Sequence, residues 1–182
     1  MDIPTIETER LRLRGWREED LSAYAQLNSN QEFMKYIGAG IPLTREESWK
    51  SMACLTGHWH LKGYGLWVVE LKDTSQFIGR VGLYNPEGWP TVEIGWGLSP
   101  EHWGQGFAIE AATAALHWAF SELEVSSLIS IIHPENAASI KIARRLGESY
   151  DRNEVVGSIE CSIYKISRQE YESLYHQDSA KP

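Results

Sequence analysis

The sequence predicts an α+β fold, layered α/β/α, built on a mixed and mostly antiparallel sheet. Residues 65–71 and 76–84 are apolar runs separated by the turn-like KDTS, which predicts a hairpin of adjacent antiparallel strands. Residues 91–98, a long alanine-rich helix and the apolar run 127–133 then follow in order, which predicts one right-handed parallel crossover. The chain has 182 residues, enough for one substantial core, so we expect a single domain over residues 1–182.

Three elements are expected before the hairpin. Leucines and arginines alternate over residues 10–14, RLRLR, which predicts a strand with its leucines toward the core and its arginines toward water. The acidic run at residues 18–20 suits the positive N-terminal end of a helix. A second helix is expected from Thr44, because Thr44 and Glu47 have the spacing of a capping box.

The strand expected at residues 91–98 has two different faces. Glu93 alternates with Gly95 and Gly97 on one face, and glycines inside a strand indicate a bulge or the close approach of another backbone. We therefore expect this face to leave room for a ligand. The opposite, apolar face consists of Val92, Ile94, Trp96 and Leu98.

The crossover consists of a helix and a buried strand. Residues 127–133, SLISIIH, are nearly all apolar, which is typical of a strand covered on both faces. The helix before them starts after Gly106 and has apolar residues at spacings of three or four, which predicts an amphipathic helix. This stripe is Ile109, Ala112, Leu116, Phe120 and Leu123.

Three elements are expected at the C-terminal end. Asn136 suits the N-cap of a helix. A strand is predicted at residues 157–167, GSIECSIYKIS. The capping-box spacing of Ser167 and Glu170 predicts a short helix directly after it. Residues from about 176 onward are polar and are expected to form a flexible tail.

The bulk composition narrows the class of protein. A formal net charge of −8 argues against a surface that binds nucleic acid. No run approaches the ~20 apolar residues of a membrane span, and the start lacks the apolar core of a signal peptide. Cys54 and Cys161 are therefore expected to be buried thiols in a reducing cytoplasm. We expect a soluble cytoplasmic protein with no nucleic-acid or membrane partner.

Residues 103–108, WGQGFA, carry the strongest ligand-binding signal. Glycines directly before a long helix allow main-chain N–H groups to approach a phosphorylated ligand. The loop is not a Walker loop, because no lysine follows Gly106. It also does not match the dinucleotide fingerprint G-x-G-x-x-G, because Ile109 stands where the third glycine would be. A tight connection without a ligand is the alternative that the spacing alone leaves open.

The wider context resembles the acyl-CoA-binding segment of the GNAT acetyltransferase superfamily. Its signature [QR]-x-x-G-x-[GA] is met by Gly106 and Ala108, while Trp103 stands where Gln or Arg is usual. RLRLR, IGRVGLY, EIGWGLSPEHWGQGFAIEA and the N-x-x-S helix together look like the ribosomal-protein-alanine N-acetyltransferase-like branch. The resemblance covers about Thr8 to Ser167.

The resemblance implies a GNAT acyl-CoA N-acyltransferase fold of about seven strands, with a splayed parallel pair. It implies acetyl-CoA as cosubstrate and transfer of its acetyl group to a primary amine in a ternary complex. The acceptor is either a protein N-terminal α-amine or a small-molecule amine, and the protein is a monomer or a homodimer. The predicted cofactor-binding residues are Trp96, Gly97, Leu98, Trp103, Gly104, Gln105, Gly106, Phe107, Ala108, Asn136 and Arg144.

These residues divide by the part of coenzyme A they would hold. Main-chain N–H groups of residues 103–108 would bind the diphosphate, and backbone groups of Trp96 and Leu98 would pair with the pantetheine arm. Asn136 is either a helix cap alone or a pantetheine ligand as well. Arg144 is either a phosphate ligand or part of a solvated helix face.

Two residues are predicted to be catalytic. Glu93 is the leading general base for the amine, acting through a bridging water, and its alternative is an exposed strand carboxylate. Many members of the superfamily protonate the thiolate with a tyrosine, but Ala143 occupies that position here. Ser139 or water must then act as the acid, unless the thiolate leaves unaided. His133 is a further candidate for a proton, with packing at a strand end as its alternative.

The remaining candidates are weaker. His58 and His60 have H-x-H spacing without a third ligand nearby, so no metal is expected. Trp16 and Trp49 are candidates for the wall of an acceptor pocket. The absent tyrosine also permits a catalytically silent acyl-CoA-binding sensor, and another kind of nucleotide-binding module is a third possibility.

Overall fold

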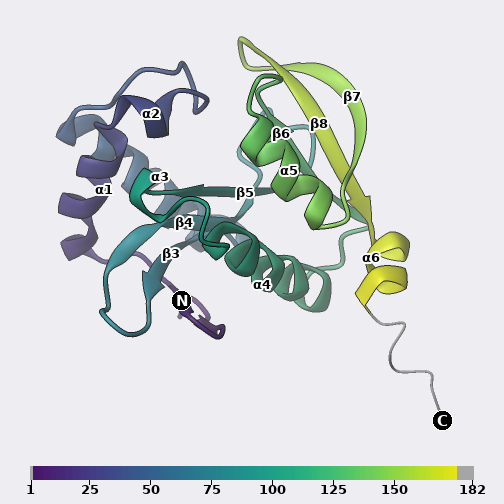
Figure 1. Ribbon diagram of the computed structural model, residues 1–182, viewed down its shortest axis with the longest axis horizontal. Coiled ribbons are helices and arrows are strands. Elements are labelled where there is room, and N and C mark those ends of the chain that lie inside the picture. Colours follow the sequence, from purple (N-terminus) through teal and green to yellow (C-terminus); the bar gives the residue numbers. More distant parts are fainter. Residues whose placement is uncertain (1, 176–182) are drawn as a thin grey trace.

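The computed structural model describes residues 2–175, so the tail expected from about residue 176 lies outside the described residues. Within this range the strands are β1 (Ile6–Glu7), β2 (Leu11–Arg14), β3 (Leu66–Leu71), β4 (Phe77–Tyr84), β5 (Glu93–Leu98), β6 (Ser127–Ile132), β7 (Ser149–Val156) and β8 (Ile159–Ser167). They form one sheet in the order β1-β2-β3-β4-β5-β6-β8-β7 (Figure 1). Only β5 and β6 pair in parallel within the described range. The predicted mixed, mostly antiparallel sheet is confirmed.

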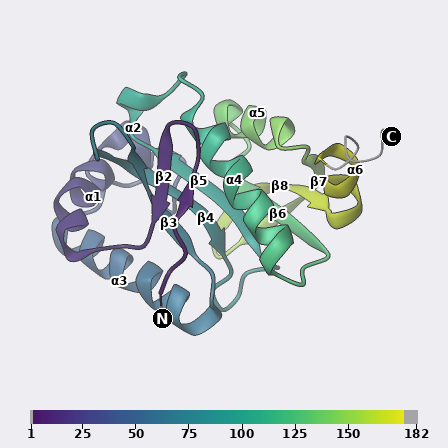
Figure 2. The same ribbon diagram turned by 90° about the horizontal axis from the view of Figure 1, so that it is seen from below.

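The α-helices of the described chain are α1 (Leu21–Asn28), α2 (Gln31–Met34), α3 (Arg45–Lys62), α4 (Phe107–Glu122), α5 (Ala137–Arg145) and α6 (Arg168–Tyr175). Two short 3-10 helices cover Glu18–Asp20, directly before α1, and Pro100–His102. Helices α1 and α3 pack together on one face of the sheet, and α4 crosses the other face (Figure 2). The layering is therefore α/β/α, as predicted. The capping box of Thr44 with Glu47 is present at the start of α3, and Ser167 and Glu170 exchange the same bonds before α6.

The main core lies between α4 and the sheet. Ala112, Leu116 and Phe120 of the predicted stripe are buried there, together with the additional alanines Ala111, Ala115 and Ala119. Alanine side chains let the helix axis come close to the strands, because they add little thickness between the two layers. This close packing fixes α4, and with it the loop at the N-terminal end of α4.

The arginines of the strand predicted at residues 10–14, which contains β2, do not all face water as expected. Arg14 is 6% exposed, and its guanidinium donates to both carboxylate oxygens of Asp20 at 2.7 and 2.8 Å. Its Nε also donates to Glu70 on β3, over 2.7 Å. The expectation was wrong because a buried charge is tolerated where ion pairs and hydrogen bonds satisfy it, and alternation alone does not show this.

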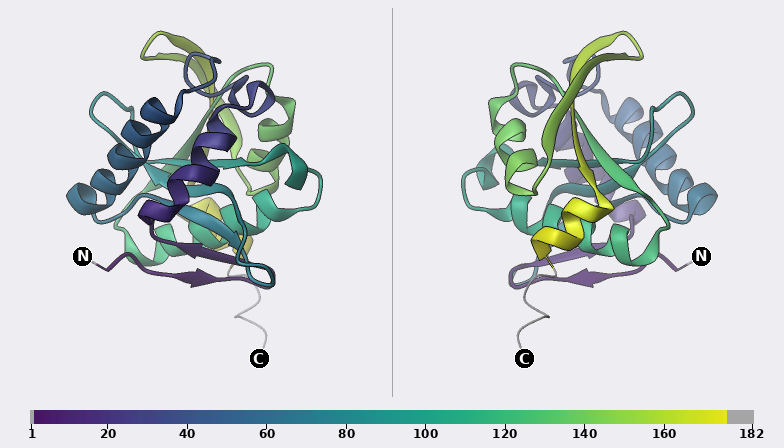
Figure 3. Two further views of the ribbon diagram at one scale, coloured as in Figure 1. Left: turned by 90° about the vertical axis from the view of Figure 1, so that its left-hand side faces the viewer. Right: turned by 90° about the vertical axis from the view of Figure 1, so that its right-hand side faces the viewer.

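Two strands and one helix were not predicted from the sequence. β1 has two residues and α2 has four, which are too short to show a period. β7 has eight residues, but its side chains are nearly all exposed and polar, so no apolar alternation marks it. It pairs with β8 through the main chain, and the two strands extend beyond the body of the molecule as a twisted ribbon (Figure 3). The sheet therefore has eight strands instead of about seven.

Both cysteines are free thiols, as expected. Cys161 is buried on β8, but Cys54 is exposed on α3, so the expectation that both are buried was wrong for Cys54. Among the described residues, no helix has both the length and the apolar composition to cross a bilayer.

Candidate active site

The loop before α4 presents a row of main-chain amides. Gly104 and Gly106 have φ angles of 73° and 83°, a left-handed conformation that favours glycine, and Gly106 is the N-cap of α4. No described side chain caps this end of the helix. A Cβ placed on Gly104 would meet no atom within 4 Å, so the space beside it is open. This helix end therefore offers N–H groups and the positive end of the helix dipole to an anion.

Arg10, just before β2, holds this loop in position. Its Nη1 donates to the main-chain oxygen of Gln105 over 3.0 Å, and its guanidinium carbon lies 4.3 Å from the centre of the Phe107 ring. Its Nε and Nη2 pair with Glu110, in the first turn of α4, at 2.7 and 2.6 Å. None of these contacts uses a main-chain N–H of residues 104–108, so the loop is fixed while these donors stay available. The N–H of Trp103 donates to the oxygen of Pro100 over 3.2 Å.

The parallel strands β5 and β6 separate after a single registered pair. Glu93 faces Ile129 in that pair, and the amide of Ile129 donates to the oxygen of Val92 over 3.1 Å. Farther along, the next link is made by a side chain, because Ser130 Oγ lies 2.9 Å from the oxygen of Ile94. The splayed parallel pair implied by the resemblance is therefore confirmed.

On the edge of β5 that faces β6, two main-chain oxygens already accept hydrogen bonds from side chains, and the residue between them does not. The oxygen of Ile94 accepts from Ser130, and the oxygen of Leu98 accepts from Trp103 Nε1 over 2.7 Å. Main-chain groups of alternate residues in a strand point to the same side, so those of Trp96 also face the gap. The N–H and carbonyl of Trp96 and the N–H of Leu98 are thus left to pair with an extended ligand.

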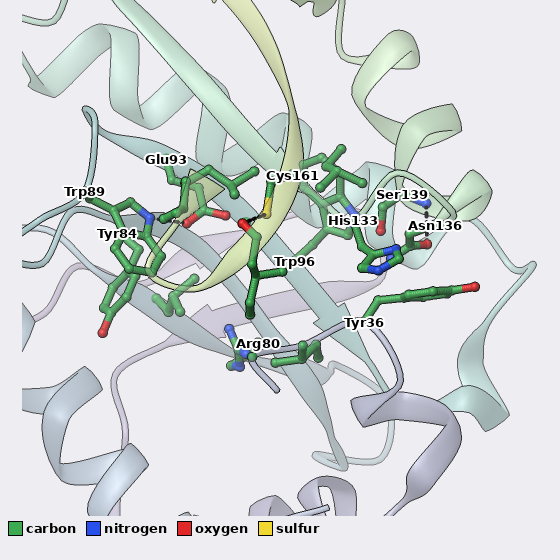
Figure 4. A pocket seen from close by; sticks show the side chains of 18 of the residues that line it. Tyr36, Arg80, Tyr84, Trp89, Glu93, Trp96, His133, Asn136, Ser139 and Cys161 are labelled. Carbon is green, nitrogen blue, oxygen red and sulfur yellow. Dashed lines mark hydrogen bonds between the residues drawn. The ribbon is translucent and has the colours of Figure 1, made fainter. Parts of the chain in front are cut away.

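A cavity of about 320 Å³ connects the Glu93 face of the sheet with this gap. In Figure 4, Glu93 and Trp89 lie at one end, and Asn136 and Ser139 lie at the other. The cavity is large enough for a small ligand group. Further lining residues are Tyr36, Ile37, Leu55, Leu66, Arg80, Tyr84, Trp96, Ile131, His133 and Cys161.

The surroundings of Glu93 raise the pKa of its carboxyl group toward neutral pH. Burial raises its pKa to about 7, and this effect outweighs the hydrogen bond from Trp89 and the positive charge of Arg80, which both lower it. Trp89 Nε1 donates to Glu93 Oε2 over 2.7 Å and fixes the orientation of the carboxylate. A carboxylate with a pKa near neutral pH is suited to take up and release a proton.

The other end of the cavity is formed where β6 passes into α5. Asn136 is the N-cap of α5, as predicted, since its Oδ1 accepts from the amide of Ser139 over 3.1 Å. Asn136 and Ser139 both also line the cavity. The imidazole of His133 packs against the ring of Tyr36, with ring centres 4.9 Å apart and planes tilted by 34°. Tyr36 belongs to an irregular segment after α2, and no pattern in the sequence singled it out.

The comparisons with known proteins agree with this geometry. The family model described as an acetyltransferase (GNAT) domain matches residues 10–148. The chain belongs to the GNAT acetyltransferases. YkkB of Bacillus subtilis (strain 168), an uncharacterized protein, is 31% identical over 152 residues, which is 81% of this chain and 86% of that protein.

Solved structures share this fold. The acetyltransferase from Agrobacterium tumefaciens superposes with a TM-score of 0.78 and 31% identity, covering 92% of this chain and 96% of that one. A ribosomal α-N-protein acetyltransferase in complex with coenzyme A superposes with a TM-score of 0.76 over 90% of this chain and 98% of that one. At 18% identity, the second likeness shows the fold alone.

This GNAT acetyltransferase uses acetyl-CoA as its cosubstrate and transfers the acetyl group to an amine. The residues present fit this cosubstrate. The uncapped helix end and the open space at Gly104 suit a diphosphate, and the separated strands suit an extended thioester arm.

Several predicted residues lie away from the cavity. Arg144 is exposed on α5 and does not line it. Trp49 is 53% exposed, and Trp16 packs with Tyr24 and Phe77, so the expectation that these two tryptophans form the wall was wrong. The tryptophans that do line the cavity are Trp89 and Trp96.

His58 does not present a free ring nitrogen to a metal. Its Nδ1 lies 2.8 Å from the oxygen of Tyr64, and its Nε2 accepts from the amide of Asn85 over 3.0 Å. These two main-chain contacts fix a neutral tautomer with the proton on Nδ1, and burial lowers the pKa of the ring. Over the described residues no cluster of three potential metal ligands is found.

Glu148 is a buried carboxyl that no pattern in the sequence singles out. It is 3% exposed, and its Oε1 lies 3.0 Å from Ser130 Oγ. The Ser130 hydroxyl has one proton, and the Ile94 oxygen 2.9 Å away can only accept it. A protonated Glu148 can donate its own proton to Ser130, which leaves the Ser130 proton for the oxygen of Ile94. Burial, the larger cause, and the nearby charge of Glu93 raise the pKa of Glu148 to about 8, consistent with this bonding.

Replacing Glu148 with glutamine is expected to stabilise the protein at alkaline pH. The folded carboxyl keeps its proton up to about pH 8, while the unfolded one loses it near 4.5. The free energy of unfolding of the wild type therefore falls as pH rises between these values, by up to about 1.4 kcal/mol per pH unit. Glutamine keeps a donor for Ser130 without this loss.

Thermal unfolding at pH 5 and pH 8.5 checks this expectation. The melting temperature of Glu148→Gln should exceed that of the wild type at pH 8.5 and approach it at pH 5. Glu9→Gln, at an exposed position, is the matched control and should follow the wild type. If the melting temperatures of the wild type and Glu148→Gln fell equally from pH 5 to pH 8.5, this would contradict a protonated Glu148.

Proposed function

We propose that this GNAT acetyltransferase transfers the acetyl group directly, in a ternary complex, to a primary amine that enters the cavity beside Glu93. The observation that carries the proposal is the position of Glu93. This carboxylate, with a pKa raised to about 7 by burial, lines a cavity that reaches the open edge of β5. Amine and thioester can therefore meet in one enclosed space.

The proposed mechanism assigns one task to each group. Coenzyme A is held through its diphosphate by the amides of residues 103–108 and through its pantetheine by the backbone of Trp96 and Leu98. Glu93 takes a proton from the amine, directly or through a water, and the amine nitrogen attacks the thioester carbon. N–H groups near Trp96 to Leu98 receive the developing negative charge on the carbonyl oxygen.

The last step is release of the thiolate. The C–S bond breaks, and the sulfur takes a proton from Ser139 or from water. Ser139 is supported by its place on the cavity wall beside Asn136. A thiol has a pKa of about 8.5, so the thiolate is also an adequate leaving group without an acid. Loss of the Ser139 hydroxyl should therefore matter less than loss of Glu93.

The acceptor is a protein N-terminal α-amine or a small-molecule amine. The order of the four motifs supports a place in the ribosomal-protein-alanine N-acetyltransferase-like branch. We further propose a single domain over residues 1–182, a monomeric or homodimeric state and a cytoplasmic location. The continuous sheet supports the single domain, and the two free thiols suit a reducing compartment.

A turnover screen tests the proposal. Acetyl-CoA is incubated with the protein and N-terminal Ala and Ser peptides, polyamines, amino acids and aminoglycosides, and thiol release is followed. We expect release that depends on an amine from at least one class. Tight acetyl-CoA binding without release from any class would instead favour the silent sensor. Thermal stabilisation by ATP or NAD but not by coenzyme A would favour another nucleotide-binding module.

A further inference from the structure

Arg80 and Glu93 lie on the same face of the sheet, at opposite ends of a short strip. In the register of β4 with β5, Arg80 pairs with Gly97 and Tyr84 pairs with Glu93. Between these two pairs lies Gly82 opposite Gly95. Directly paired residues share a face, so Arg80 and Glu93 project into the same space, about 13 Å apart along the strands. The glycines between them carry no side chains to fill it.

Arg80 has no partner for its charge within the described chain. Its Nε is buried without a hydrogen bond, and no described carboxylate lies within ion-pair distance of its guanidinium. The other arginines of the sheet differ in this respect, since Arg12 and Arg14 both pair with Glu70. A partly buried guanidinium without a partner is costly, so a bound ligand that supplies an anion would be stabilised there.

Arg80 lines the same cavity as Glu93. Arg80 lines the cavity together with Tyr36, Tyr84 and Trp89 (Figure 4). It is near enough to Glu93 for its charge to lower the pKa of that carboxyl. The pyrophosphate-binding loop lies elsewhere, at the N-terminal end of α4, so Arg80 is not needed there. The cavity therefore has a base, a cation without a partner and aromatic side chains on its wall.

We propose that the acceptor is a small primary amine that also carries a carboxylate, and that Arg80 binds this carboxylate. This inference rests on the proposed function and specifies its substrate class. The guanidinium pairs with the carboxylate in a bidentate, charge-assisted contact, which places the amine toward Glu93. A polyamine has the opposite property, because its second ammonium group is repelled by Arg80.

The test compares acceptors that differ only in the anionic group. Phenylalanine is compared with phenylalaninamide and 2-phenylethylamine, leucine with leucinamide, and spermidine is included as the polyamine. The measured quantity is kcat/KM for amine-dependent release of coenzyme A. We expect the wild type to favour the acid over the amide by about 10-fold or more, the range of a hydrogen bond to a charged group.

Variants of Arg80 separate its role from amine basicity. In Arg80→Gln the ratio of acid to amide should fall about 10-fold or more below the wild-type ratio, since amine basicity affects both proteins alike. Arg80→Lys should keep part of the preference because it keeps the charge. Arg45→Gln, on the exposed start of α3, should keep the wild-type ratio. An unchanged ratio in Arg80→Gln, or a wild-type preference for spermidine or the amides, would overturn the inference.

A binding measurement keeps the inference separate from the proposed function. Calorimetric titration compares N-acetylphenylalanine with N-acetylphenylalaninamide, in the presence of coenzyme A. Wild type should bind the acid more tightly, and Arg80→Gln should bind both alike. If no amine releases coenzyme A, the proposed function fails, while this comparison still decides whether Arg80 recognises a carboxylate. Equal binding of both compounds by the wild type would overturn the inference alone.

Discussion

Replacing Gly106 with valine is expected to weaken acetyl-CoA binding about 100-fold, equivalent to about 2.8 kcal/mol. Only Arg10 Nη2 lies within 4 Å of the position that a Cβ would take at Gly106, at 3.4 Å. The rest of that space is open, and it is where a diphosphate must lie to reach the amides of the loop. The valine side chain would fill it. Isothermal titration with acetyl-CoA measures the loss.

The matched control for this variant is Gly63→Val. Gly63 ends α3 with a φ of 79°, close to the 83° of Gly106, and a Cβ there would meet no atom within 4 Å. Both variants therefore pay a similar cost for a β-branched residue with positive φ, of order 1–2 kcal/mol. Only Gly106→Val should lose acetyl-CoA affinity. Similar affinities for the two variants would show that the loop does not bind the diphosphate.

Replacing Glu93 with glutamine is expected to lower kcat about 100- to 1000-fold, within the usual contribution of a general base. Acetyl-CoA affinity should change little, because Glu93 faces the acceptor side of the cavity. Glutamine retains an oxygen that can accept from Trp89 Nε1, so the local structure should persist. Steady-state kinetics and titration with acetyl-CoA together separate turnover from binding. An unchanged kcat would remove Glu93 from the mechanism.

The pH profile gives a second test of Glu93. The base acts in its ionised form, so the wild-type rate should rise with pH and level off above the raised pKa of about 7. The acceptor amine titrates in both proteins, and this effect cancels in the ratio of their rates. The ratio of wild type to Glu93→Gln should therefore fall about tenfold per pH unit below pH 7 and be flat above it. A ratio independent of pH would contradict the assignment.

Features with a local period or a local cap could be predicted from the sequence. The α4 stripe, the capping boxes at Thr44 and Ser167 and the Asn136 cap each depend on neighbouring residues. The glycine loop was recognisable because its spacing and context occur together. The strand β7 had no such signal, since its main-chain bonds to β8 hold an exposed, polar segment.

Features that depend on distant segments could not be predicted. The Ser130–Glu148 bond joins residues 18 positions apart, and it is the packing around Glu148 that makes the carboxyl neutral. The free guanidinium of Arg80 is also invisible in the sequence, because the alternation of β4 shows its face but not the lack of an anion there. Tyr36 reaches His133 across nearly a hundred residues of chain.

The most direct test of the account is a crystal structure of the protein with acetyl-CoA. We expect the diphosphate to lie on the amides of residues 103–108 and the pantetheine arm to pass between β5 and β6, bonded to the backbone of Trp96. The thioester should then reach the cavity near Glu93. Acetyl-CoA bound elsewhere, with the loop before α4 empty or β5 and β6 closed against each other, would contradict the account.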